Sequence, residues 1–170
     1  GESAFENCTS LYSLTIPSSV TSIGANSFKG CTSLNKIDLQ AAITSINESS
    51  FEGCTSLSSL TLPSSVTSIR ANSFKGCKSL RKIEMPSTLA FFGKDCFYKC
   101  SSLEEFVVLS PPPTKLVKEK SSSLSRNNLY SKSVPQIVIP SSVSAIEEEV
   151  FSKCTSIKRV LIPSSVKALK

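Results

Sequence analysis

The chain has 170 residues and a formal net charge of +6 at pH 7, which is the length of one domain. It contains no histidine, which excludes His-based acid–base catalysis, Ser-His-Asp and Cys-His nucleophiles, and the commonest metal ligand. The sequence also has no P-loop, no dinucleotide fingerprint and no Cys-x-x-Cys pair, so we predict a protein that is not an enzyme and uses no cofactor or metal.

The first predicted element of each repeat is a short strand with the pattern Leu-x-x-Leu-x-Leu, in which Ile, Met or Val can replace leucine. The pattern covers residues 11–16, 34–39, 57–62, 80–85 and 157–162, and residues 134–139 restore it after an interruption. Its last four positions alternate, which predicts a strand with one buried face. Proline often follows and should end the strand, because it cannot donate a hydrogen bond to the ladder.

A second predicted strand follows, with the pattern Val-x-x-Ile, as in Val20–Ile23 and Val66–Ile69. It should lie on another side of the coil. A polar stretch before each phenylalanine, such as Asn72-Ser73-Phe74, predicts a capped single helical turn. Glycine follows two residues after three of the phenylalanines, at positions 30, 53 and 76, which predicts a left-handed exit from that turn.

Phenylalanine and cysteine repeat every 23 residues, from Phe5 and Cys8 onward. A fixed period of this length predicts a solenoid of stacked coils, about seven of them here. The residues assigned to the core of the stack are Phe28, Phe51, Phe74, Phe97 and Phe151, with Cys31, Cys54, Cys77, Cys100 and Cys154. The thiols should be free, because the ladder spacing exceeds that of a disulfide. Cys96 takes a slot that otherwise holds serine, so we expect it to be partly exposed.

The complete unit, with strand, proline, Val-x-x-Ile and Ser-Phe-x-Gly-Cys, resembles the BspA-like or Treponema-type leucine-rich repeat over residues 1–109 and 134–170. The slot that usually holds asparagine or cysteine carries mostly hydroxyls, at Ser19, Ser65, Thr88, Ser142 and Ser165, with Ala42 as the exception. The resemblance implies a repeat solenoid with short parallel β-strands on two faces and short helical or 3-10 turns. Proteins of this class are typically large surface proteins of bacteria and parasitic protists, and several act in adhesion.

Residues 110–133 interrupt the pattern within one degenerate repeat of the single domain 1–170. They form a Pro-, Ser- and Lys-rich insert with five basic side chains, Lys115, Lys118, Lys120, Arg126 and Lys132, against Glu119. We interpret them as a candidate anion-binding loop, for a sulfated or sialylated glycan or an acidic protein patch. The alternative is a solvated loop in a repeat that has decayed.

Two strand positions in each repeat should point outward between the inward leucines, and they vary from copy to copy. The candidate protein-binding residues there are Lys36, Asp38, Lys82, Glu84, Glu105 and Arg159. On repeat arrays such a face is the usual contact surface. The alternative is an ordinary solvated sheet face, since it has few of the Trp, Tyr and Arg residues that dominate interfaces.

The leading hypothesis is a protein-interaction module of a cell-surface adhesin that binds host-cell or extracellular-matrix proteins. The alternative is an intracellular leucine-rich-repeat scaffold or regulator in the cytoplasm. We expect no nucleic acid, because the charge is local and lacks interleaved aromatics. No apolar run is long enough to cross a membrane. Neither end coil has a distinct polar cap, so end-to-end dimers are expected.

Overall fold

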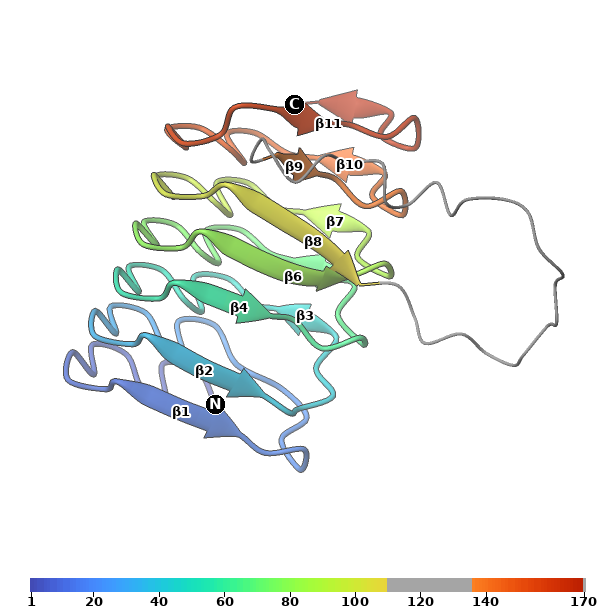
Figure 1. The fold of residues 1–170 in the computed structure, drawn as a ribbon. Helices are drawn as coiled ribbons and strands as arrows, with labels where there is room; N and C mark the ends of the chain where they lie inside the picture. The colour runs from blue at the N-terminus through green and yellow to red at the C-terminus, as the bar shows by residue number, and fades with distance from the viewer. Residues whose placement is uncertain (110–135, 170) are drawn as a thin grey trace, which may run out of the picture.

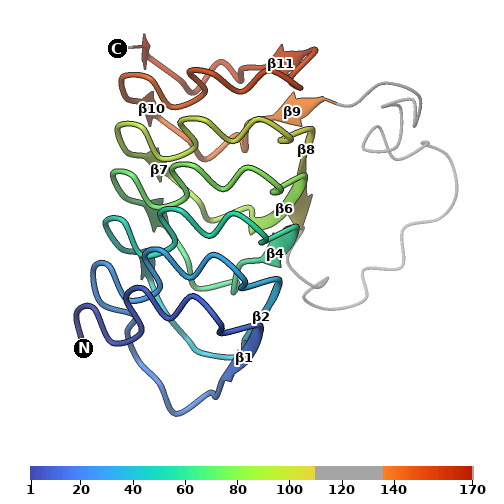
Figure 2. The ribbon, with the colours of Figure 1, turned by 90° about the vertical axis from the view of Figure 1, so that its left-hand side faces the viewer.

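The structure is a computed structural model that describes residues 1–109 and 136–169. The chain winds into a parallel β-solenoid whose two termini lie at opposite ends of the stack (Figure 1). Each coil passes through a strand on one side, a strand on a second side, and a run of turns that leads into the next coil (Figure 2). This architecture confirms the predicted leucine-rich-repeat solenoid with short parallel strands on two faces.

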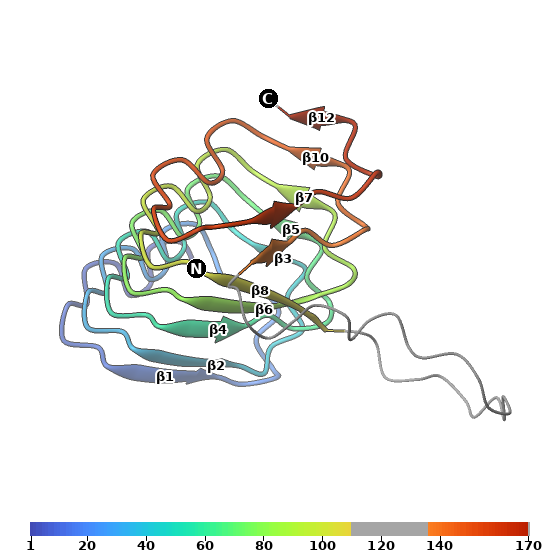
Figure 3. The ribbon, with the colours of Figure 1, turned by 45° about the horizontal axis from the view of Figure 1, so that its top comes forward.

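We call the side formed by the Leu-x-x-Leu-x-Leu strands the front side. It carries β1 (Ser13–Ile16), β2 (Lys36–Leu39), β4 (Ser59–Thr61), β6 (Lys82–Pro86), β8 (Glu105–Leu109), β9 (Ile137–Val138) and β11 (Val160–Leu161). The back side is a five-stranded sheet of β3 (Ser45–Ile46), β5 (Ser68–Ile69), β7 (Phe91–Phe92), β10 (Ala145–Ile146) and β12 (Ala168–Leu169). The two stacks of arrows are visible together in Figure 3. The back strands are shorter than the Val-x-x-Ile pattern predicts, and Val20–Ile23 forms none.

The register of the ladders equals the sequence period. Leu14 lies beside Ile37 and Leu60 beside Ile83, each 23 residues apart, so equivalent side chains stack on one another. The back sheet is continuous, but the front side divides into β1–β2, β4–β6–β8 and β9–β11. The backbone ladder is therefore interrupted between β2 and β4, and again between β8 and β9.

The turns around the phenylalanines are not helical, which corrects the predicted helical or 3-10 turns. No residue of the described ranges is helical. The residues two before and two after each phenylalanine adopt positive φ, for example Ser49 (51°) and Gly53 (73°) around Phe51, which breaks any helical run. The turn amides instead donate to the next coil, as Phe51 N does to Ser73 O at 2.8 Å. The predicted left-handed glycines are confirmed at Gly30, Gly53 and Gly76.

The described chain forms about six coils rather than seven. Phe151 stacks on Phe97 with centroids 6.0 Å apart, and β10 pairs directly with β7, so the turn side and the back side pass straight from one coil to the next. Only the front side gains a strand, β9, after residues 110–135. The repeat that the 54-residue step from Cys100 to Cys154 suggested adds a front strand and no phenylalanine turn.

The core is a column of aromatic rings. Phe28, Phe51 and Phe74 are buried, and neighbouring rings lie 5.3–5.5 Å apart and nearly parallel. Near β9 the core holds two further rings: Phe92 and Phe106 occupy slots that hold isoleucine or leucine in the earlier coils. Phe106 lies 5.2 Å from Phe97 and 5.9 Å from Phe151. The larger side chains fill the additional space that the extra front strand requires.

Hydroxyl groups replace the usual asparagine ladder on the way to the back side. Ser65 Oγ donates to Ile43 O at 2.6 Å, and Ser165 Oγ to Val143 O at 2.7 Å. Thr88 makes the equivalent bond to Val66, and Ser142 to Leu89. Each hydroxyl therefore satisfies a carbonyl of the preceding coil, which explains why this slot tolerates serine and threonine.

We expect Gly93→Ala to destabilise the protein by about 1–3 kcal/mol. A Cβ at Gly93 would lie 2.7 Å from Ala71 N and 2.8 Å from Arg70 C, so backbone must move to admit it. Chemical denaturation measures the loss. Arg70→Ala, in the same slot one coil earlier and exposed, is the control and should change stability by less than about 0.5 kcal/mol. Equal losses in the two variants would contradict the steric argument.

Candidate interaction surface

The middle of the front side brings three of the predicted binding residues together. Lys82 and Glu84 point outward from β6, and Glu105 lies beside Lys82 in the register of β6 with β8. Lys82 Nζ is 2.7 Å from Glu84 Oε1, and Thr61 Oγ1 donates to Glu84 Oε2 at 3.0 Å. These hydrogen bonds, that of Lys82 first, lower the pKa of Glu84, and the same bond raises the pKa of Lys82. This part of the surface is charged but internally paired.

A groove opens where the ladder between β2 and β4 is interrupted. It has a volume of about 540 Å³ and is lined by both strands, with Lys36, Asp38, Ser59 and Thr61 at its outward positions. A second hollow of about 380 Å³ lies between β1 and β2. Lys36 and Asp38 line both, and Gln40 Nε2 donates to Asp38 Oδ2 at 2.9 Å. The sequence identified these two residues but could not show the groove, because it depends on a missing ladder.

The remaining predicted residues do not join this surface. Arg159 is exposed just before β11, beyond the interruption between β8 and β9. The five basic residues of the candidate anion-binding loop, Lys115, Lys118, Lys120, Arg126 and Lys132, lie outside the described residues. The candidate surface on the described coils is therefore the outward face of β1, β2, β4, β6 and β8.

The coil geometry matches a known repeat along nearly the whole chain. The family model described as BspA type leucine rich repeat region matches residues 1–115 and 117–170, in 6 copies. The chain belongs to the BspA-type leucine-rich repeat family. The leucine-rich repeat is a non-catalytic protein-interaction scaffold, so family membership makes a protein-interaction module of this chain.

Two crystal structures are similar to this BspA-type chain. The T. pallidum leucine rich repeat protein (TpLRR) shares 24% identity and a TM-score of 0.73, with 96% of this chain and 62% of that one covered. A leucine-rich repeat protein from Bacteroides ovatus shares 27% identity and a TM-score of 0.70, over 98% of this chain and 41% of that one. The chain thus spans less than two thirds of either relative. No curated protein matches it.

Two further findings concern the described residues of the BspA-type chain. None of its elements there is a helix of the length and apolarity needed to cross a membrane. No group of three or more His, Cys, Asp or Glu side chains in these ranges could hold a metal ion.

The cysteines of this BspA-type repeat are free thiols that also act as donors. Cys54 Sγ lies 3.1 Å from Phe28 O, and Cys77 Sγ lies 3.1 Å from Phe51 O, each bridging to the phenylalanine of the preceding coil. Cys31, Cys100 and Cys154 repeat the contact at 3.0 Å. Burial raises the pKa of Cys54 to about 12 and that of Cys154 to about 11. The sequence predicted small apolar groups here and missed the hydrogen bond.

The expectation that Cys96 is partly exposed is wrong. Its thiol is fully buried, and burial raises its pKa well above the usual range. The serines in the same slot, Ser27, Ser50 and Ser73, are buried too, with hydroxyls that donate to backbone carbonyls such as Asn47 O and Arg70 O. The slot faces inward, so serine there was not a sign of exposure.

We expect iodoacetamide at pH 8 to label Cys8 and spare the other six cysteines of the folded BspA-type chain. Cys8 is exposed, whereas the others are buried, and alkylation requires an accessible thiolate. Intact-mass spectrometry with peptide mapping gives the count and the site. All seven thiols should react in concentrated guanidinium chloride, which is the positive control. Rapid labelling of Cys96 in the folded protein would contradict its placement.

Proposed function

We propose that this chain is an interaction module of a cell-surface adhesin, which binds host-cell or extracellular-matrix proteins through its front side. The groove between β2 and β4 is the observation that carries the proposal. It lies on the side whose outward residues change from coil to coil, while the inward residues stay leucine or isoleucine. A repeated scaffold with a varied surface is suited to protein recognition.

The chemistry of the groove favours weak contacts that are repeated. Its outward residues are small or singly charged, and Tyr12 is the one aromatic nearby in the sequence. Interfaces gain most of their affinity from Trp, Tyr and Arg, so binding by this chain alone should be modest. Both similar crystal structures are longer, which supports an array in which several such surfaces act together.

Members of the BspA-type class are typically surface proteins, which supports a location outside the cell. One observation favours the alternative of an intracellular scaffold: all seven cysteines are free, as expected in a reducing compartment. Antibody labelling of intact source cells against permeabilised controls separates the two. Signal on intact cells supports the adhesin, and signal only after permeabilisation rejects it in favour of cytosolic partners.

A second experiment tests the front side directly. Asp38→Arg with Ser59→Arg places two large cations in the groove and should lower adhesion to host cells and matrix proteins at least tenfold. The matched control, Thr44→Arg with Ser144→Arg, places the same side chains at exposed positions beside the back sheet. It should leave adhesion within about twofold. Equal losses would reject the front side as the binding surface.

Two finer proposals from the sequence accompany this function. If the basic insert binds an anionic glycan, charge reversal at Lys115, Lys118 and Lys120 should abolish binding, and affinity should fall steeply with salt. If end coils pair, sedimentation velocity should show a dimer whose fraction rises with protein concentration. Salt-independent binding rejects the first proposal, and a concentration-independent monomer rejects the second.

A further inference from the structure

Three lysines converge on one tyrosine at the turn edge of the solenoid. Lys75, Lys99 and Lys153 place their Nζ atoms 5.5, 5.2 and 5.4 Å from the centre of the Tyr98 ring. The tyrosine is half-buried, while Lys99 and Lys153 are exposed. We call these four residues the Tyr98 cluster. It lies on the turns, away from the front-side groove.

The repeat builds the cluster by placing consecutive coils side by side. Lys75 and Tyr98 each follow the phenylalanine of their coil, and the stacked rings of Phe74 and Phe97 are 5.5 Å apart. Lys99 and Lys153 come two residues after phenylalanine, the slot that holds Gly30, Gly53 and Gly76 in the earlier coils. The two lysines adopt φ of 60° and 59°, a conformation that glycine takes at lower cost. Positive charge thus replaces the residue that the backbone prefers.

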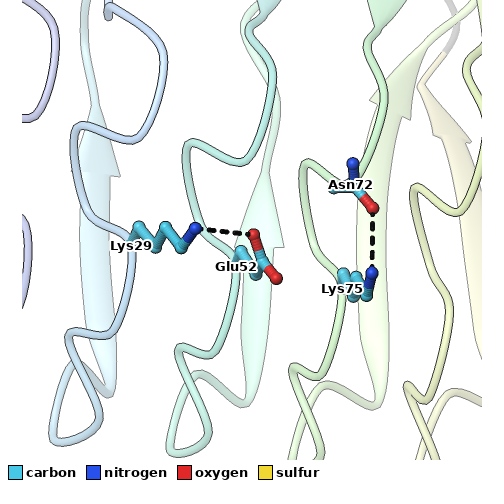
Figure 4. Close-up of polar contacts among 4 residues, drawn as sticks. All are labelled: Lys29, Glu52, Asn72 and Lys75. Carbon is cyan, nitrogen blue, oxygen red and sulfur yellow. Dashed lines mark hydrogen bonds and ion pairs between the residues drawn. The ribbon is translucent and has the colours of Figure 1, made fainter.

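The same edge is neutral in the preceding coils and positive here. Lys29 pairs with Glu52 at 3.4 Å, whereas Lys75 donates to the uncharged Asn72 Oδ1 at 3.3 Å (Figure 4). Among the described residues, no ion pair involves Lys75, Lys99 or Lys153. Glu149 is the nearby acid that favours the charged form of Lys153. The cluster carries more positive than negative charge and faces solvent.

The backbone around the cluster is already hydrogen-bonded, which limits what can bind. Gly76 N donates to Tyr98 O at 2.8 Å and Lys99 N to Ser152 O at 3.1 Å, within the coil-to-coil ladder. A peptide therefore finds no free strand edge there to extend. The cations are lysines, which act as compact point charges and lack the planar fork that arginine offers to carboxylates. Recognition must rest on charges spaced along the solenoid axis.

We propose that the Tyr98 cluster binds a sulfated polysaccharide that runs along the turn edge across three coils. Each coil contributes ammonium groups to successive sulfates, and the Tyr98 ring holds the lysines in place. This site goes beyond the proposed protein-binding function of the front side and does not depend on it.

The test uses heparin as the sulfated probe and isothermal titration calorimetry as the readout. The parent protein is the full chain with Lys115, Lys118, Lys120, Arg126 and Lys132 changed to glutamine, so that the basic insert does not contribute. We expect the cluster variant, Lys75→Gln with Lys99→Gly and Lys153→Gly, to bind roughly ten- to hundred-fold more weakly. The two glycines are the residues of the earlier coils, so the variant should fold.

A matched control removes three exposed lysines elsewhere, as Lys36→Gln, Lys158→Gln and Lys167→Gln. It lowers the net charge equally and should change the dissociation constant less than about threefold. Unchanged thermal melting of both variants shows that folding is intact.

Three results would overturn the proposal. One is a parent that does not bind heparin at all. Another is an equal loss of affinity in the control and the cluster variant, which would mean that net charge alone drives binding. The last is a polyglutamate peptide that binds the cluster as tightly as heparin, since the partner would then be an acidic protein. None of them bears on adhesion through the front side.

Discussion

Replacing Phe51 with alanine should lower the free energy of unfolding by about 3–5 kcal/mol. Phe51 is fully buried in the ring column, with Phe28 at 5.3 Å and Phe74 at 5.5 Å. Alanine would leave a ring-sized cavity between two coils whose backbones are tied by ladders on three sides, so collapse is restricted. Urea denaturation followed by circular dichroism measures the change.

Phe5→Ala is the matched control, because Phe5 occupies the same slot in the first coil. Its ring stacks on Phe28 alone among the described contacts and is 37% exposed. The loss there should be below about 1.5 kcal/mol, since most of the ring never leaves water. Equal effects at the two positions would mean that the ring column does not stabilise the interior coils as described.

Raising the pH from 8 to 11 should destabilise the protein by several kcal/mol, because buried thiols resist ionisation. Burial, aided by the neighbouring Cys31, raises the pKa of Cys54 from 9.0 to about 12. The stabilisation from this thiol is complete below pH 9 and is lost as the pH rises from 9 toward 12, at about 1.4 kcal/mol per unit. Burial also raises the pKa of Cys77, Cys96 and Cys100, so their losses add.

Cys54→Ser separates the thiol from other groups that titrate in the same range. The serine hydroxyl does not ionise and can still donate to Phe28 O, while the lysines and tyrosines are unchanged. We expect urea denaturation in the presence of reductant to show about 2–3 kcal/mol less destabilisation of this variant between pH 8 and 11. Parallel stability curves for the two proteins would contradict the assigned pKa.

The sequence predicted the strands and the stacking, because both follow from which residues recur. Leu60 and Ile83 are apolar at the same phase of the period, and the ladder pairs them. The turn was harder to predict. Asn72-Ser73-Phe74 has the composition of a capped helix start, but its amides bond to the next coil, and Asn72 adopts φ of 55°. Local preference was overridden by contacts 23 residues away, which composition does not reveal.

The candidate surface was predicted in part. Alternation placed Lys36, Asp38 and Lys82 on the outward face, because side chains along a strand alternate. The groove arises where two neighbouring strands fail to pair, and no residue type marks such a failure. The Tyr98 cluster did leave a signal: Lys99 and Lys153 stand where glycine recurs. An alignment of the copies that scored departures from the consensus would have found it.

The 23-residue register has a consequence for how such a gene can change. Since each described side chain of the ladder touches its own counterpart one repeat away, recombination between copies can add or delete whole units without creating a new kind of contact. A length change that is not a multiple of the period would break that phase almost everywhere. The connection between β8 and β9 joins two strands on the same side while Phe97 and Phe151 remain stacked, so it is the place where lineages can diverge in length and keep the array intact.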